Sequence, residues 1–172
     1  MTLLVKQPAE KFTVAIEFSG KLPSGATIAS GSVVAAAMSE PASSTTLAAA
    51  AAADATTLLL TANVLGGARL TVNPNGANQE VVHVLSISGA GPYTATLLGP
   101  LMKAHTTGEA VSYQPGASAD VLTSTTATIS GTQARATVKK GIHGQHYQLT
   151  FFVVLSNGDN LEEDLPMRIV QT

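Results

Sequence analysis

The chain carries several short runs in which apolar residues recur at every second position, the pattern of a β-strand with one face on a core. The clearest run covers residues 147–155, where the alternating residues are Tyr147, Leu149, Phe151, Val153 and Leu155. Phe152 and Val154 on the other face are also apolar, which predicts a central strand covered on both sides. These runs make an all-β fold the expected class.

Similar runs predict strands at residues 12–18, 26–38, 58–65, 68–72, 81–87, 94–98, 110–113, 127–130 and 133–138, and a closing strand near 165–169. Turn-forming residues separate these runs. Among them, Asn157-Gly158 predicts a type I′ hairpin turn, because both residues readily take left-handed conformations. Gly31 is expected to break or bulge the run at 26–38.

Residues 43–57 differ in composition, because they are rich in Ala, Ser and Thr. Six consecutive alanines at 48–53 favour a short helix capped near Ser44 or Thr45, and the low complexity of the segment fits a linker equally well. Either interpretation makes this segment a domain boundary. A second boundary is expected at 114–120, where Pro115 and Gly116 occur.

These boundaries predict a discontinuous host domain at residues 1–42 and 117–172, a linker at 43–57 and an inserted small β domain at 58–116. The host strands suit an immunoglobulin-like β-sandwich of about six or seven strands, although the Cys and Trp hallmarks of that fold are absent. The insert is expected to be a second small β-sandwich or barrel.

Charged residues are scarce. Nine Lys and Arg face eleven Asp and Glu, and together they form 12% of the chain, about half the usual share. No basic stripe for a nucleic acid is present. A weakly charged surface favours association, so we expect a homo-oligomer and contacts with other proteins. A soluble domain that is simply rich in Ala and Thr would have the same composition.

No apolar stretch is long enough to cross a bilayer, and residues 1–10 lack the apolar core of a secretory signal. The sequence therefore predicts no membrane partner. It predicts a protein that stays in the cytoplasm in which it is made.

The four histidines are candidates for metal binding. His143 and His146 are spaced as two ligands of one metal would be, with the acidic run at 162–164 downstream. The simpler interpretation is a turn before a strand and an acidic run that protects a sheet edge. His83 is expected to be a structural residue within a strand, and His105 a loop residue that hydrogen-bonds to nearby backbone. We therefore expect no metal site.

Motifs for catalysis are missing from the sequence. The chain has no cysteine, no Gly-x-Ser-x-Gly elbow, no His-Glu-x-x-His helix and no phosphate-binding loop. It also has no tryptophan, and aromatic residues form 4% of the chain. We expect no catalytic residue, no cofactor and no enzymatic activity.

Two motifs lie close together within residues 63–111. The sequence Asn-Gln-Glu-Val-Val at 78–82 is followed by Pro-Leu-Met-Lys-Ala-His-Thr-Thr-Gly-Glu-Ala-Val at 100–111. This stretch resembles a small β module that recurs in bacteriophage structural proteins, in which a Gln-Glu strand precedes a Pro-Leu-x-x-Ala-His-x-x-Gly-x-x-Val element. The resemblance covers under a third of the chain.

The flanking segments carry further motifs. Lys-Gln-Pro-Ala-Glu at 6–10 precedes the first strand, a Gly-x-x-Gly-x-x-Tyr motif at 141–147 opens the long strand, and Gly158-Asp159 lies in the turn after it. They are similar to small virion proteins encoded among the head and tail genes of tailed bacteriophages. The resemblance implies a virion component without a defined place, and no catalytic residue comes with it.

We therefore expect a non-enzymatic structural component of a tailed-phage virion, assembled in the host cytoplasm. A capsid decoration or head-fibre protein on the outer shell is favoured, and a collar, head–tail connector or tail protein is the alternative. Its partners would be major capsid or connector subunits and copies of itself. An alternative of another class is an immunoglobulin-like adhesin that binds host-surface glycan at the turn 157–160.

The candidate interface residues are Leu3, Leu4, Val5 and Lys6. They are expected to form either a docking arm outside any clear domain or the first strand of the sandwich.

Overall fold

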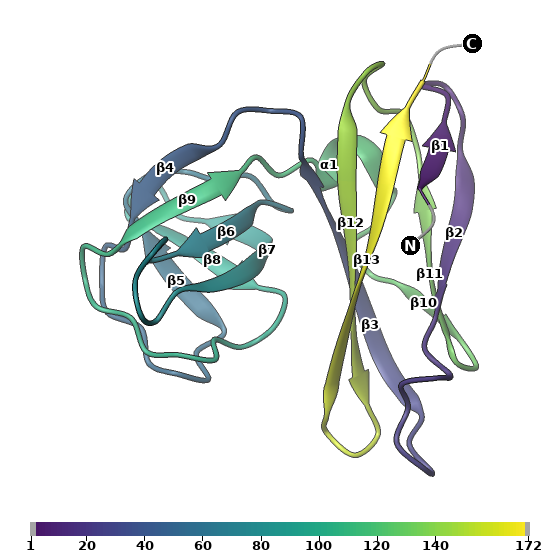
Figure 1. Cartoon of the computed structure of the whole chain (residues 1–172), viewed down its shortest axis with the longest axis horizontal. Coiled ribbons are helices and arrows are strands. Elements are labelled where there is room, and N and C mark those ends of the chain that lie inside the picture. The colour runs from purple at the N-terminus through teal and green to yellow at the C-terminus, as the bar shows by residue number, and fades with distance from the viewer. Residues whose placement is uncertain (1–2, 171–172) are drawn as a thin grey trace. The chain divides into compact units, whose positions relative to one another are not determined.

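The computed structural model describes residues 3–170, and within this range the chain is almost entirely β-structure, as Figure 1 shows. The one helix of the described range, α1 (Ser118–Val121), has four residues. The expected all-β class is confirmed. The chain divides into two compact units. Unit 1 combines the chain up to Ala35 with the chain from Ser118 onward, and unit 2 is Ala36–Ala117.

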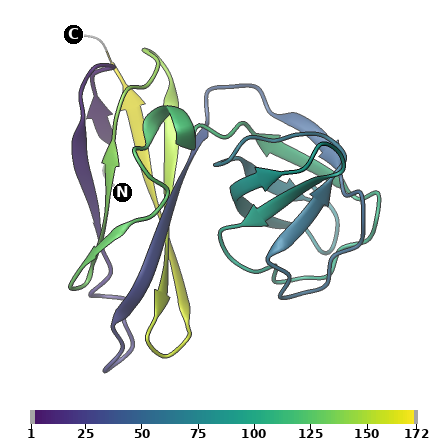
Figure 2. The same cartoon turned by 180° about the vertical axis from the view of Figure 1, so that it is seen from behind.

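Unit 1 contains two sheets, which are visible from both sides in Figures 1 and 2. The first has the strand order β1 (Leu4–Lys6), β13 (Asn160–Ile169), β12 (His146–Leu155) and β3 (Ile28–Ala37). The second has the order β10 (Thr128–Ser130), β11 (Gln133–Val138) and β2 (Phe12–Glu17). β1 runs parallel to β13, and the strands of the second sheet are antiparallel.

The alternation in the sequence explains how these sheets pack. In β2, Val14 is buried while its neighbours Thr13 and Ala15 are exposed. In β12 the five alternating residues from Tyr147 to Leu155 are buried, whereas Phe152 and Val154 on the other face are half-buried. The second face of β12 is therefore only partly covered. The immunoglobulin-like connectivity of unit 1 stays a prediction.

Gly31 does not break its strand, contrary to the sequence-based expectation. It lies within the continuous strand β3, where a Cβ atom would come within 2.9 Å of Ile129 Cδ1 and 3.3 Å of Ala127 Cβ. Glycine here lets the side chains of Ile129 and Ala127 pack close to the β3 backbone.

The type I′ prediction for the turn after β12 is wrong. Gly158 has a positive φ of 91°, but Asn157 is not among the residues with positive φ, and a type I′ turn needs both. Leu155 instead pairs with Asp159 across a three-residue loop, with glycine in the left-handed position. The Asn157 side chain accepts a hydrogen bond from the Asp159 amide at 3.1 Å, which stabilises this alternative.

Unit 2 is a single six-stranded antiparallel sheet. Its strand order is β4 (Ser43–Thr46), β9 (Ala110–Gln114), β6 (Arg69–Val72), β7 (Glu80–Ser88), β8 (Tyr93–Leu97) and β5 (Thr57–Leu60). A bridge between Leu47, just after β4, and Leu60 of β5 joins the two ends of this order. The Ala48 amide donates to the Leu59 carbonyl at 2.8 Å beside it. The sheet therefore closes into a small barrel.

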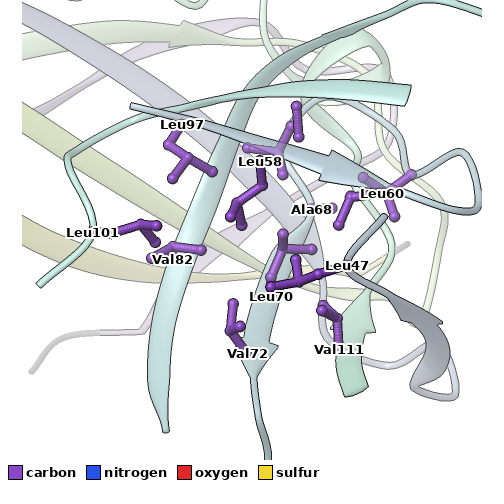
Figure 3. Close-up of a cluster of buried hydrophobic side chains, with 13 residues drawn as sticks. Leu47, Leu58, Leu60, Ala68, Leu70, Val72, Val82, Leu97, Leu101 and Val111 are labelled. Atoms are coloured by element: carbon purple, nitrogen blue, oxygen red, sulfur yellow. The ribbon is translucent and has the colours of Figure 1, made fainter. Parts of the chain in front are cut away.

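The barrel interior holds one continuous apolar cluster, drawn in Figure 3. Leu60, Leu70 and Val72 come from two different strands, and each is fully buried. Leu47 and Leu101 reach the same cluster from outside the strands. Unit 2 thus has a hydrophobic core of its own.

The segment at 43–57 is neither a helix nor a linker. Its first part is β4, which pairs with β9, and the alanine run continues as irregular chain with bends, in which Ala51 is bridged to His105. Alanine's helix preference is weak compared with the backbone pairing and the burial of Leu47 at this site. Unit 2 therefore begins at Ala36, well before the predicted start of the inserted domain at residue 58.

No helix in the described part of the chain is long and apolar enough to span a membrane.

Gly116 offers a test of the packing in unit 2. A Cβ atom there would lie 2.4 Å from the carbonyl oxygens of Gly66 and Leu65 and 2.6 Å from the Ala68 nitrogen. Because these are backbone atoms, Gly116→Ala should lower the free energy of unfolding by about 1–3 kcal/mol. Gly20→Ala is the control, since a Cβ atom at Gly20 would have no other atom within 4 Å. Equal stability of the two variants in urea unfolding would contradict this packing.

Candidate functional site

The candidate interface residues lie in and beside strand β1, so the structure favours the first-strand interpretation over a free arm. Leu4 pairs with Met167 of β13, and Lys6 pairs with Ile169. The Val170 amide also donates to the Lys6 carbonyl at 2.8 Å. The backbone of this segment is therefore held by unit 1. A role of these residues in contacts with other chains stays a prediction.

The side chains of this segment differ in exposure. Leu3 is 46% exposed and Val5 is 58% exposed, so both are accessible to another chain. Leu4 is half-buried, and Lys6 is buried. Of the four predicted residues, Leu3 and Val5 thus present the most surface to a partner.

Lys6 has a structural role inside unit 1. Its ammonium group donates to the carbonyl oxygens of Lys140 at 2.5 Å, Gln7 at 2.6 Å and Pro8 at 3.4 Å. Burial lowers the pKa of Lys6, and the nearby Glu10 carboxylate raises it in part. These bonds tie β1 to the segment after β11, so Lys6 positions the strand instead of facing a partner.

A groove of about 280 Å³ runs between β1 and β2. Leu3, Leu4 and Val5 line one side of it, and residues 12–15 of β2 together with Leu165 complete it. Among the described strands, β1 pairs with β13 alone and β2 with β11 alone, so each strand is the edge of its own sheet. The groove is therefore an apolar opening between two sheet edges, and open edges are templates for pairing with another strand.

Sequence reasoning missed the β2 side of this groove. The alternation of Phe12 and Val14 predicts one face of a strand, but it does not show whether that strand lies at a sheet edge. Edge position depends on long-range pairing, for which a single strand carries no local signal.

His143 and His146 are not brought together with the acidic run. In the β12–β13 ladder His146 lies opposite Arg168, whereas Asp164 lies opposite Thr150. Four positions along a strand correspond to about 13 Å. Within residues 3–170, no group of three or more His, Asp or Glu side chains is placed so that it could hold a metal ion.

The acidic run lies on an uncovered part of β13. β1 pairs with Met167–Ile169, so among the described residues the earlier part of the strand has no neighbour on that side. Glu163 forms an ion pair with Lys21, and Asp164 accepts a hydrogen bond from the Thr150 hydroxyl at 2.7 Å. Acidic side chains and Pro166, which lacks an N–H, discourage unwanted pairing at such an edge.

The turn proposed for a glycan site, 157–160, is held by local bonds. Asn157 Nδ2 donates to an Asp159 carboxylate oxygen at 2.7 Å, and the turn side chains are exposed. This pattern is that of a hairpin turn stabilised from within.

Unit 2 contains a buried polar network around His105. Its Nε2 lies 2.7 Å from Glu80 Oε1, and its Nδ1 lies 2.7 Å from Glu109 Oε2. Ionised carboxylates only accept hydrogen bonds, so a ring N–H of His105 can donate to them. The expected bonds from the His105 ring to nearby backbone are therefore replaced by bonds to two carboxylates.

The surrounding bonds show what the network does. Glu80 accepts hydrogen bonds from the amides of Met102 at 2.8 Å and Lys103 at 3.2 Å. Asn78 Nδ2 donates to the Ala104 carbonyl at 2.9 Å and to Glu109 at 3.1 Å. The network thus clamps the loop between β8 and β9 onto the turn before β7. Its hydrogen bonds connect residues within unit 2, which suits a structural role.

Comparison of the chain with models of known protein families finds no match, and a search of curated proteins also finds none. The resemblance to phage structural proteins therefore rests on the quoted motifs alone and stays a prediction. His105 and Glu80 occupy defined positions of these motifs, whereas Glu109 occupies a variable one.

Acid titration tests the network through Glu109. Burial raises the pKa of this carboxyl, but hydrogen bonds from the Thr106 amide, His105 and Asn78 outweigh it and bring the pKa to about 2. The ionised carboxylate then stabilises unit 2 above about pH 4.5, and this contribution is lost as the pH falls towards 2. The melting temperature of the wild type should fall more steeply over this range than that of Glu109→Gln. Parallel curves for the two proteins would contradict this assignment.

Removing the imidazole tests the clamp directly. His105→Ala removes a buried ring and its hydrogen bonds to two half-buried carboxylates, so the free energy of unfolding should fall by roughly 1–3 kcal/mol. His143→Ala, at an exposed histidine, is the control and should change it by less than about 0.5 kcal/mol. Denaturant unfolding measures both, and similar small losses would show that the network is unimportant for stability.

Proposed function

We propose that this protein is a non-enzymatic structural component of a tailed-phage virion, and specifically a decoration or head-fibre protein on the outer capsid shell. The observation that carries the proposal is the apolar groove between the open sheet edges of unit 1. The motif resemblance supplies the phage context. The partners are shell subunits, together with further copies of this chain.

The groove offers two kinds of contact at once. An extended segment from a shell subunit pairs with the backbone of β1 or β2, and its side chains cover Leu3 and Val5. Backbone pairing supplies direction and register, while burial of apolar area supplies most of the binding free energy. This combination suits a protein that stays permanently in a particle.

The low charge of the chain supports the same proposal. Charged residues form 12% of the sequence, and the groove itself is lined by apolar residues and one threonine. When such an apolar surface is covered by a partner, few charged groups have to be removed from water, so the free-energy cost of desolvation is small. Such contacts suit a permanent assembly.

Cryo-electron microscopy of particles with and without the gene tests the proposal. The deletion should remove density from the outer shell, and added purified protein should restore it. Loss of density at the collar or tail would overturn the shell assignment. If mass spectrometry of wild-type particles finds no copy of the protein, the virion assignment itself fails.

Val5→Asp should prevent rebinding to deletion particles while leaving the fold intact. A carboxylate in the groove would be desolvated by the incoming chain, so the affinity should fall by at least about tenfold. Ile142→Asp is the matched control, because Ile142 is 63% exposed on the same unit but does not line the groove. Co-sedimentation of labelled protein with particles measures rebinding. Equal rebinding of the two variants would exclude the groove as the interface, and Ala15→Asp repeats the test if Val5→Asp does not fold.

A further inference from the structure

A second recess of unit 1 has a different chemistry. It has a volume of about 250 Å³ and lies on the outward-facing side of the sheet β10–β11–β2, beside the segment 123–126. Six of its lining residues carry hydroxyl groups: Thr13, Thr123, Ser124, Thr126, Thr128 and Thr137. The others are Ala136 and Arg135. The recess therefore contains many hydroxyl groups and a single charge.

Arg135 is held in place without being neutralised. Its Nε and Nη2 donate to Gln133 Oε1 at 3.2 and 2.8 Å, which fixes one side of the guanidinium group. Within residues 3–170 it forms no salt bridge, and Glu17 on the same face of the sheet accepts a hydrogen bond from the Ser19 amide instead. The guanidinium group has five N–H donors, so donors remain for a planar anionic group of a ligand.

The hydroxyl groups around this charge are partly preorganised. Thr123 Oγ1 donates to the Thr137 carbonyl at 3.3 Å, and Thr13 and Thr137 place their Oγ1 atoms 3.4 Å apart. The exposed hydroxyls of Thr126 and Thr128 form no hydrogen bond with other described residues, which leaves them available to a ligand. Each hydroxyl both donates and accepts, and each threonine adds a methyl group.

We propose that this recess binds a single acidic sugar residue, a polyhydroxylated ring that carries a carboxylate or a sulfate. The hydroxyl lining matches the alternating donors and acceptors of a sugar, the threonine methyl groups meet its C–H face, and Arg135 pairs with its anionic group. The volume is smaller than that of a typical drug-sized site, which suits one ring. This inference goes beyond the proposed structural role and does not depend on it.

Protein-observed NMR titration of the purified full chain tests the proposal. The probes are galacturonic acid, galactose-6-sulfate, neutral galactose and inorganic sulfate. At least one of the two acidic sugars should shift amide signals of β11 and bind at least about tenfold more tightly than galactose. Its affinity should fall as salt is added, because Arg135 is solvent-accessible. The comparison of the two acidic sugars identifies which anionic group is preferred.

Two variants locate the site. Arg135→Gln should weaken binding by about tenfold or more, whereas Arg168→Gln, at an exposed position of the other sheet, should not change it. The double variant Thr126→Val with Thr128→Val keeps the charge and should weaken the acidic sugar but not inorganic sulfate. The proposal would be overturned if galactose or inorganic sulfate bound as tightly as the acidic sugars. It would also be overturned if Arg135→Gln bound them with unchanged affinity, or if no probe shifted any amide signal at millimolar concentration.

Discussion

The bridge between Leu47 and Leu60 is the contact that removes the open strand edges of unit 2. It joins the residue that follows β4 to the last residue of β5, so the six-stranded sheet closes on itself and every strand has two neighbours. Unit 1 has no equivalent bridge between β1 and β2 among its described residues. An open edge exposes backbone donors and acceptors that water or another chain must satisfy. Among the described residues, the open edges to which another strand could be added therefore lie in unit 1 and not in the barrel.

Period-two patterning locates most strands because the pattern reports burial directly. It places β11 at its observed bounds and finds β12 to within one residue. The patterns fail where tertiary contacts override local preference. The alanine run at 48–53 has a helical preference of only tenths of a kilocalorie per residue, and backbone pairing with Leu59 and His105 outweighs it.

The sequence predicts the exposed residues of the candidate interface better than the buried one, because burial of a charged residue depends on distant partners. Leu3 and Val5 stand out in sequence as apolar residues, and their exposure agrees with a contact role that is still to be tested. Lys6 is charged, which normally indicates the surface, yet three carbonyl oxygens, one of them from a segment distant in sequence, hold it inside. One carboxylate partner of His105 is equally hidden in the sequence, since Glu80 lies 25 residues away along the chain, whereas Glu109 is only four residues away. Such partners become visible only when the strands are paired.

Several of the few charged residues of this chain make bonds within the fold. Lys6, Glu80 and Glu109 are committed to internal bonds, and Lys21 is paired with Glu163. Among the charged residues of 3–170 only Lys6 is buried, so the outer surface carries the others. These charges are few and nearly balanced, so long-range electrostatic attraction is expected to be weak. The proposed recognition at the groove would then depend on short-range shape and backbone pairing, which salt affects weakly. The binding proposed for the recess at Arg135 would be the exception, because a solvent-accessible cation among hydroxyl groups would make it sensitive to salt. The effect of salt on binding would therefore distinguish the two surfaces of unit 1, because it is expected to be weak at the apolar groove and strong at the recess beside Arg135.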